Sequence, residues 1–234
     1  MKIAAIGDLH TRATAREQLQ AVLHSIPGEV DVLVLAGDLT DNGLPAEAEI
    51  LAEELQGMDL QVIAVLGNHD HEGDAQEEIS SLLVQAGVCI LDGTVHQIEH
   101  VGFVGTKGFC GGFDGLLIQP FGERALKTFI NASIEEAVRL ENAMARLDCE
   151  RRVAVTHYAP IKATLEGEPQ ELFPFLGSGR LANALDRQKV DLILHGHAHH
   201  GSPFGQTPGG IPVYNVCRFV QERHNGQNFC LFDL

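Results

Sequence analysis

Seven residues with metal-binding side chains follow short apolar segments along the chain. They are two aspartates, four histidines and one asparagine: Asp8, His10, Asp38, Asn68, His157, His197 and His199. Carboxylate oxygens, imidazole nitrogens and an amide oxygen suit Mn, Fe or Zn, and suit Cu(I) less well. Two divalent ions held close together can clamp a phosphate group and activate a shared water. The set therefore predicts a dinuclear metal site suited to phosphate chemistry.

The segments that precede these side chains explain how distant residues can meet. Strands are expected at Lys2–Ile6, Val32–Ala36, Val62–Leu66, Arg152–Thr156 and Leu192–Leu194. In open α/β sheets the carboxyl ends of the strands line the ligand crevice, so the residues that follow each strand converge there. Further strands are expected at Val213–Val216 and Asn228–Phe232, with a hairpin formed by Val95–Ile98 and Val101–Gly105.

Amphipathic segments alternate with the strands, which is typical of a layered α/β fold. Thr14 and Glu17 form a capping-box pattern before the first helix. Pro45 suits the first turn of the second helix, whose glutamates, including Glu47, are expected to face solvent. Other helices are expected around Ile79–Leu83, from Glu123 to Leu147 and around Leu181–Leu185. We predict a single domain spanning residues 1–234.

Composition and charge limit the kinds of partner and the cellular location that we expect for this protein. The chain has 32 acidic and 16 basic residues, a formal net charge of −16, which disfavours large nucleic acids and favours a small phosphorylated substrate. No segment approaches the ~18 apolar residues of a membrane span, so no membrane association is expected. The first residues look like a strand and not a signal peptide, which predicts a cytoplasmic location. The five cysteines form no Cys-x-x-Cys pair, so no disulfide framework or thiolate zinc site is expected.

Two irregular segments, Thr106–Gly122 and Tyr158–Gly179, are longer than typical connections, and loops of that length are often functional. Their aromatic residues are candidates for a substrate wall: Phe109, Phe113, Phe121, Tyr158, Phe173 and Phe175. The alternative, in which the aromatic rings fill a small satellite core, fits the sequence equally well. Lys107, Arg12 and Arg218 are the candidates for a contact with the phosphate or the base of a substrate.

Five blocks of the sequence resemble the signature motifs of the calcineurin-like metallophosphoesterase superfamily. In chain order they are Asp8-Leu9-His10, Gly37-Asp38-Leu39-Thr40-Asp41, Gly67-Asn68-His69-Asp70, His157 and Gly196-His197-Ala198-His199. The resemblance implies a four-layer α/β/β/α sandwich of two mixed sheets. It also implies a dinuclear metal site at the carboxyl ends of the strands.

The resemblance assigns a role to each matched residue. One ion would be held by Asp8, His10, Asp38 and His199, and the other by Asp38, Asn68, His157 and His197. A metal-bridging hydroxide would attack phosphorus, while His69, oriented by Asp70, would protonate the leaving oxygen. His195 and His200 fall outside the matched positions. We expect a structural role for His195 and keep His200 as a candidate substrate contact.

The blocks are most similar to the branch that contains cyclic-nucleotide and other small phosphodiesterases. His157-Tyr158-Ala159-Pro160 resembles that branch, although Ala159 stands where many members carry a second proline. Phosphoprotein phosphatases of the superfamily carry an arginine soon after the Gly-Asp block and a glutamate after Asn-His. Here Asp41-Asn42-Gly43 lacks the arginine, and Asp70 replaces the glutamate.

We therefore expect a metal-dependent phosphate ester hydrolase. Small phosphodiesters are favoured because the motifs supply no arginine to grip a dianionic monoester. A phosphomonoesterase or a phosphoprotein phosphatase is the alternative within the same chemistry. A non-catalytic metal-binding scaffold is the alternative of another class, and it is disfavoured because the chain retains every ligand and His69.

Overall fold

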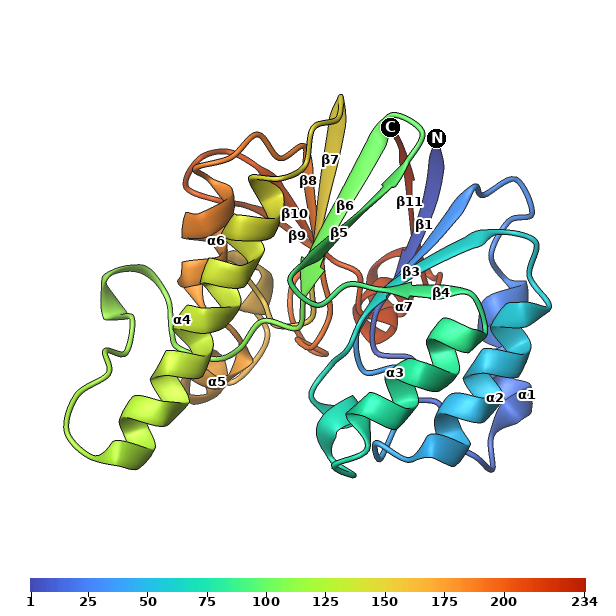
Figure 1. Cartoon of the computed structure of the whole chain (residues 1–234), viewed down its shortest axis with the longest axis horizontal. Helices are drawn as coiled ribbons and strands as arrows, with labels where there is room; N and C mark the ends of the chain where they lie inside the picture. Colours follow the sequence, from blue (N-terminus) through green and yellow to red (C-terminus); the bar gives the residue numbers. More distant parts are fainter.

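The strands form two sheets that face each other in the computed structural model, which describes residues 1–234 (Figure 1). The first sheet contains, in spatial order, β11 (Cys230–Asp233), β1 (Lys2–Ile6), β2 (Val32–Ala36), β3 (Gln61–Val65) and β4 (Val88–Ile90). The second contains β5 (Thr94–Ile98), β6 (Val101–Thr106), β7 (Arg151–Thr156), β8 (Leu192–His195), β10 (Pro212–Asn215) and β9 (Phe204–Gln206).

Both sheets are mixed. In the first, β1 to β4 are parallel and β11 pairs antiparallel with β1. In the second, β6, β7, β8 and β10 are parallel, while β5 and β9 are antiparallel edge strands. Because parallel strands of one sheet end at the same edge, the loops after them lie together.

Helices cover the outer faces of the two sheets (Figure 1). The first sheet is covered by α1 (Arg16–His24), α2 (Pro45–Gln56) and α3 (Gln76–Gln85), and the second by α4 (Arg124–Met144) and α6 (Gly179–Leu185). Two short helices, α5 (Phe173–Leu176) and α7 (Arg218–Asn225), complete the set with four 3-10 turns at His69–His71, Asp114–Leu116, Ala163–Leu165 and Gln170–Leu172. No helix is long and apolar enough to cross a membrane.

Three apolar clusters hold these layers together. The central one lies between the sheets and includes Ile3, Val34, Phe103 and Val155. A second joins the first sheet to α1, α2 and α3, and a third joins the second sheet to α4 and α6. The layers therefore run α/β/β/α, and the fold class expected from the sequence is confirmed.

The start of α1 differs from the prediction. The helix begins at Arg16, and Ala15 occupies the N-cap position without a side-chain cap. The capping box expected between Thr14 and Glu17 is therefore wrong. The Ala15 N–H donates to the carbonyl of Arg12 at 3.1 Å, and this turn leaves Thr14 ahead of the cap position.

Glu47 also differs from the prediction, because its side chain is buried. Its carboxylate accepts hydrogen bonds from the backbone and side-chain amides of Asn42 at 2.8 and 3.0 Å. The Glu47 side chain thus joins the loop after β2 to the first turn of α2.

The short elements β4, β9, α5 and α7 were not expected from the sequence, since each is too short for a clear periodicity.

Candidate metal centre

The metal-ligand candidates lie on the loops that directly follow β1, β2, β3, β7 and β8. Several have positive φ angles: Asp8 at 62°, His10 at 46°, Asp38 at 50° and His197 at 70°. Such angles are uncommon for residues other than glycine and cost free energy. The strained turns bring side chains from five strand ends to one place, which points to a functional site.

Two neighbouring glycines allow these loops to approach closely. A Cβ atom on Gly67 would collide with the carboxylate and amide of Asp38, and one on Gly196 would lie 2.6 Å from Asp8 Oδ2. Both positions therefore require glycine.

The first ligand cluster contains Asp8, His10, Asp38 and His199, whose ligand atoms all lie within 4.8 Å of one another. Asp8 Oδ1 is 3.0 Å from His199 Nε2, and the Nε2 atoms of His10 and His199 are 3.4 Å apart. Asp38 Oδ2 lies 3.7 Å from His10 Nε2. The four residues predicted to hold one ion are thus brought together.

The second cluster contains Asp38, His157 and His197, with Asn68 beside them. His157 Nε2 lies 3.3 Å from Asp38 Oδ1 and 2.9 Å from Asn68 Oδ1. Asp38 therefore directs one carboxylate oxygen to each cluster, which is the arrangement that a bridging ligand requires.

The hydrogen bonding of His157 tests whether a metal fits this donor set. Its Nδ1 lies 2.9 Å from the carbonyl of Ala36, so Nδ1 carries a proton and donates it. The Nε2 atom therefore faces two oxygen acceptors, those of Asp38 and Asn68. Three electron-rich atoms in contact repel one another unless a proton or a metal ion lies between them. A backbone carbonyl that fixes the ring is also a common companion of metal-binding histidines.

The surroundings change the proton affinity of the histidines. Burial disfavours the charged form of His157, but the carboxylates of Asp38 and Asp8 outweigh it and raise its pKa to about 9. Burial lowers the pKa of His197 to about 3 and also lowers that of His10. In the metal-free protein at neutral pH, His157 is therefore positively charged and carries a second proton on Nε2. The rings of His10 and His197 are neutral.

Metal binding is expected to displace the proton of His157. Since its metal-free pKa is about 9, this residue should release about one proton at pH 7 and almost none well above pH 9. The raised pKa also stabilises the metal-free fold below the ordinary value of 6.5, and this stability is lost as the pH rises through 9. Titration calorimetry with Mn²⁺ in buffers of different ionisation enthalpy measures the proton count. A His157→Asn variant should release fewer protons at pH 7, and an unchanged count would contradict the assignment.

His69 lies beside the first cluster, with its ring edge-on to that of His10 at 4.5 Å between centroids. Its Nδ1 lies 2.6 Å from the backbone carbonyl of Asp41, so Nδ1 donates and Nε2 remains available. The side chain is 33% exposed, so a substrate can reach it.

The Asp70 carboxylate forms no hydrogen bond or ion pair with the His69 ring, and the predicted orienting pair is wrong. Its buried carboxylate instead accepts hydrogen bonds from the backbone amides of Gly67, Leu39 and Thr40, and from the Thr40 hydroxyl, at 2.7 to 3.2 Å. Asp70 thereby joins the loops after β2 and β3. The backbone of Asp41 holds the His69 ring in its place.

Replacing Asp70 by alanine is expected to destabilise the fold. Several buried donors would lose their acceptor, which should lower the free energy of unfolding by about 3 kcal/mol. Urea unfolding of the metal-free protein measures this, with Asp148→Ala as control, because Asp148 is exposed. If Asp70→Ala kept full stability but changed the dependence of turnover on the leaving group, the role of Asp70 in orienting His69 would be restored.

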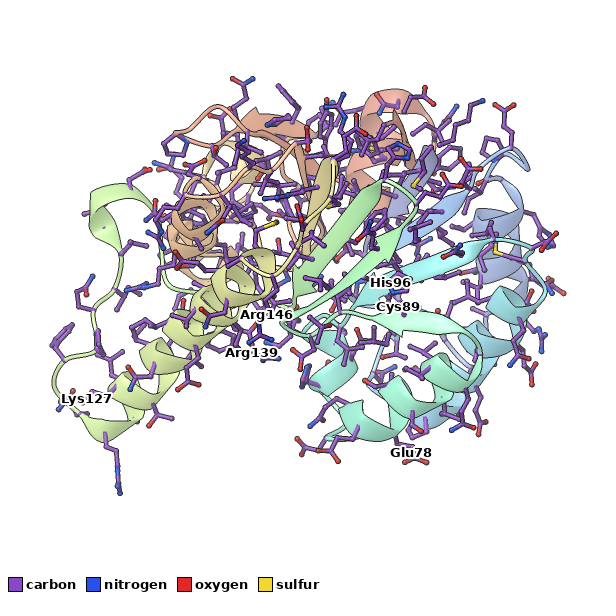
Figure 2. All side chains as sticks on the ribbon, turned by 45° about the horizontal axis from the view of Figure 1, so that its top comes forward. Glu78, Cys89, His96, Lys127, Arg139 and Arg146 are labelled. Carbon is purple, nitrogen blue, oxygen red and sulfur yellow. The ribbon has the colours of Figure 1, made fainter.

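Tyr158 and Lys107 lie next to the second cluster. The ring of Tyr158 is 4.4 Å from that of His197, and burial raises the pKa of its hydroxyl. Lys107 Nζ lies 4.9 and 5.3 Å from the ring centroids of Phe109 and Tyr158. Lys107 also lines a cavity of about 490 Å³ together with Arg139. Arg139 projects from α4 (Figure 2).

The other aromatic candidates are distributed differently. Phe113 is buried with Phe173 and Leu165 in a small separate cluster, as the satellite-core alternative expects. Phe109 packs on the cluster beneath α4, with its ring 5.1 Å from that of Phe129. Phe121 and Phe175 are exposed to solvent.

The two remaining histidines also differ in their surroundings. Both ring nitrogens of buried His195 are bonded at 2.8 Å, Nδ1 to the Gly196 carbonyl and Nε2 to the Thr164 hydroxyl, which suits a structural role. His200 is exposed, and its backbone amide donates to Glu168.

A cleft of about 410 Å³ opens at the first cluster. Its lining residues are His10, Arg12, Gln18, Asp41, His69, His199, Arg218 and Phe219. Asp41, Gln18 and Phe219 were not candidates from the sequence. Asp41 Oδ1 lies 3.3 Å from His10 Nδ1, and its Oδ2 accepts a hydrogen bond from Arg12 at 2.7 Å. Asp41 could have been proposed from the sequence, because it belongs to the Gly-Asp block. No motif contained Phe219.

Residues 1–201 match the family model described as calcineurin-like phosphoesterase. The chain belongs to this family. Purple acid phosphatase 17 of Arabidopsis thaliana is 27% identical over 214 residues, which cover 83% of this chain and 61% of that protein. A probable cyclic nucleotide phosphodiesterase of Rhodococcus erythropolis is 27% identical over 219 residues, covering 90% of this chain and 65% of that protein. The chain thus spans under two thirds of the length of these relatives.

Solved structures share the fold at low sequence identity. One matches with a TM-score of 0.64 and 14% identity, covering 99% of this chain and 98% of the other. The crystal structure of TT1561 of Thermus thermophilus matches with a TM-score of 0.57 and 14% identity, covering 94% of this chain and 90% of the other. At this identity the similarity shows the fold alone.

Proposed function

We propose that the protein hydrolyses phosphate esters of small molecules with two divalent metal ions, Mn, Fe or Zn. The observation that carries this proposal is Asp38, whose two carboxylate oxygens face separate ligand clusters. Asp8, His10 and His199 would complete one site, and Asn68, His157 and His197 the other. When bound, such ions polarise the phosphate and lower the pKa of a water toward 7.

The side chains around the clusters supply the remaining steps. His69 would donate a proton from Nε2 to the leaving oxygen, because Nδ1 is held by the carbonyl of Asp41. Ala36 keeps the His157 ring in the orientation that turns Nε2 to the site. The cleft is of a size that suits a small organic phosphate, and the net charge of −16 disfavours a large nucleic acid.

The choice between diester and monoester substrates depends on whether the cleft offers an arginine to the phosphate. The relatives include proteins named as a phosphodiesterase and as an acid phosphatase, so they support phosphate ester hydrolysis in general. The preference for diesters depended on the lack of an arginine in the motifs. Arg218 lines the cleft, so the lack of an arginine in the motifs no longer favours diesters over monoesters.

The cytoplasmic location stays a prediction.

Metal content and turnover together test the proposal. The purified protein is loaded with Mn²⁺, its bound metal is measured, and hydrolysis of bis(p-nitrophenyl) phosphate is compared with that of p-nitrophenyl phosphate. About two metals per chain with turnover of either ester would support it. A protein that binds metal but hydrolyses a broad ester panel no faster than buffer would favour the scaffold alternative. Less than one metal ion per chain together with no turnover would overturn both the hydrolase function and the metal site.

A further inference from the structure

Arg218, the first residue of α7, is a partly buried cation without a carboxylate partner. Its Nε donates to the backbone carbonyl of Asp8 at 3.1 Å, and its guanidinium carbon lies 4.5 Å from the ring centroid of Phe219. Its two terminal nitrogens form no hydrogen bond or salt bridge within the protein. The guanidinium is only partly buried, and its terminal nitrogens reach the cleft, so an anion that enters the cleft can bind them.

Five other arginines of this acidic chain have acidic partners. Arg12 is paired with Asp41, Arg16 with Glu53 and Glu54, Arg139 with Asp92, Arg151 with Asp191, and Arg187 with Glu141. Arg12 lines the same cleft, but Asp41 already balances its charge at 2.7 Å. Arg218 is therefore the cation in the cleft that is free to bind an anion.

The position of Arg218 is fixed by the backbone at the start of α7. Its own N–H donates to the Gly7 carbonyl at 3.0 Å, and the Gly7 N–H donates to Val216 at 2.8 Å. These bonds attach α7 to the end of β1, directly before the metal-ligand candidate Asp8 (Figure 1). The adjacent Phe219 ring lies 5.0 Å from that of His199, and both rings line the cleft beside Arg218.

We propose that Arg218 binds a terminal oxygen of the substrate phosphate and enables the site to accept dianionic phosphomonoesters. This inference rests on the proposed function of the metal centre. A monoester carries three terminal oxygens and a charge near −2, whereas a diester carries two such oxygens and a charge of −1. The additional oxygen and charge require a further donor, and guanidinium groups bind phosphate oxygens in pairs through charge-assisted hydrogen bonds.

Arg218→Ala and Arg218→Lys, compared with the distant surface variant Arg187→Ala, test this role. In the Mn²⁺-loaded protein, Arg218→Ala should lower kcat/KM for p-nitrophenyl phosphate by about 10- to 100-fold, and for the bis ester by less than about 3-fold. Arg218→Lys should recover part of the loss. Arg187→Ala should leave both rates unchanged, because its pair with Glu141 is exposed.

A binding measurement independent of turnover completes the test. Calorimetry with inorganic phosphate should give a Kd that rises by about 10- to 100-fold in Arg218→Ala, while the metal content stays at the wild-type value. If the wild type hydrolyses neither ester, the proposed function itself fails. If the wild type is active and Arg218→Ala either retains its phosphate affinity or loses both esters equally, the role of Arg218 is overturned and the proposed function stands.

Discussion

Replacing Asp38 by asparagine is expected to lower kcat/KM on the order of 10³-fold or more and to release metal. Asp38 Oδ2 faces His10, and Oδ1 faces His157 while accepting the backbone N–H of His69 at 2.8 Å. Asparagine keeps the shape of the side chain, but it offers one oxygen where two are required. The second cluster would also lose its only carboxylate. A loss of about 4 kcal/mol in transition-state stabilisation corresponds to about 10³-fold in rate.

Metal analysis and steady-state kinetics on Mn²⁺-loaded protein check this result. Asp191→Asn is the matched control, because Asp191 pairs with Arg151 on the surface. The proton released at pH 7 should also decrease in Asp38→Asn, since the Asp38 carboxylate is what raises the pKa of His157. A variant that retains both metals and a rate within about tenfold of wild type would exclude the bridging role.

The convergence of the ligands could be predicted because the strands before them are strongly patterned. All five residues of Val32–Ala36 are buried, and such a continuous apolar run is typical of a central parallel strand. The glycine and aspartate after it must then lie at the carboxyl edge of the sheet. The same reasoning places Asp8 after Lys2–Ile6 and His157 after Arg151–Thr156, and the structure brings these residues together.

The orientation of Asp70 could not be obtained in this way. A carboxylate beside a histidine in sequence suggests a pair, but residues His69–His71 form a 3-10 turn. With three residues per turn, successive side chains point about 120° apart. His69 therefore faces the cleft while Asp70 faces inward, where Gly67 and Thr40 donate to it.

Arg218 was a candidate phosphate contact, but no sequence pattern favoured it over Arg12. The helix that carries it spans only eight residues, of which only Val220 and Gln221 are buried. Its place depends on backbone bonds to Gly7, more than 200 positions earlier in the chain, and on the pairing of Arg12 with Asp41. Neither contact leaves a periodic pattern in the sequence.

Replacing His69 by alanine is expected to reduce turnover in proportion to how poor the leaving group is. Its Nε2 is free and its side chain is accessible, so it can donate a proton to the leaving oxygen. General acids contribute about 10²- to 10⁴-fold, so an alkyl phosphate ester should lose that much. A p-nitrophenyl ester, whose leaving group needs little protonation, should lose less than about tenfold. The metal content should remain unchanged, since His69 belongs to neither proposed ligand set.

A series of aryl and alkyl esters with leaving groups of increasing basicity measures this dependence. His71→Ala is the matched control, because His71 ends the same 3-10 turn and lines the neighbouring cavity instead of the cleft. Only His69→Ala should steepen the dependence of kcat/KM on leaving-group basicity, because only its ring borders the metal-site cleft. An equal loss for every leaving group would show that His69 donates no proton and only positions the ring of His10, against which its own ring packs edge-on.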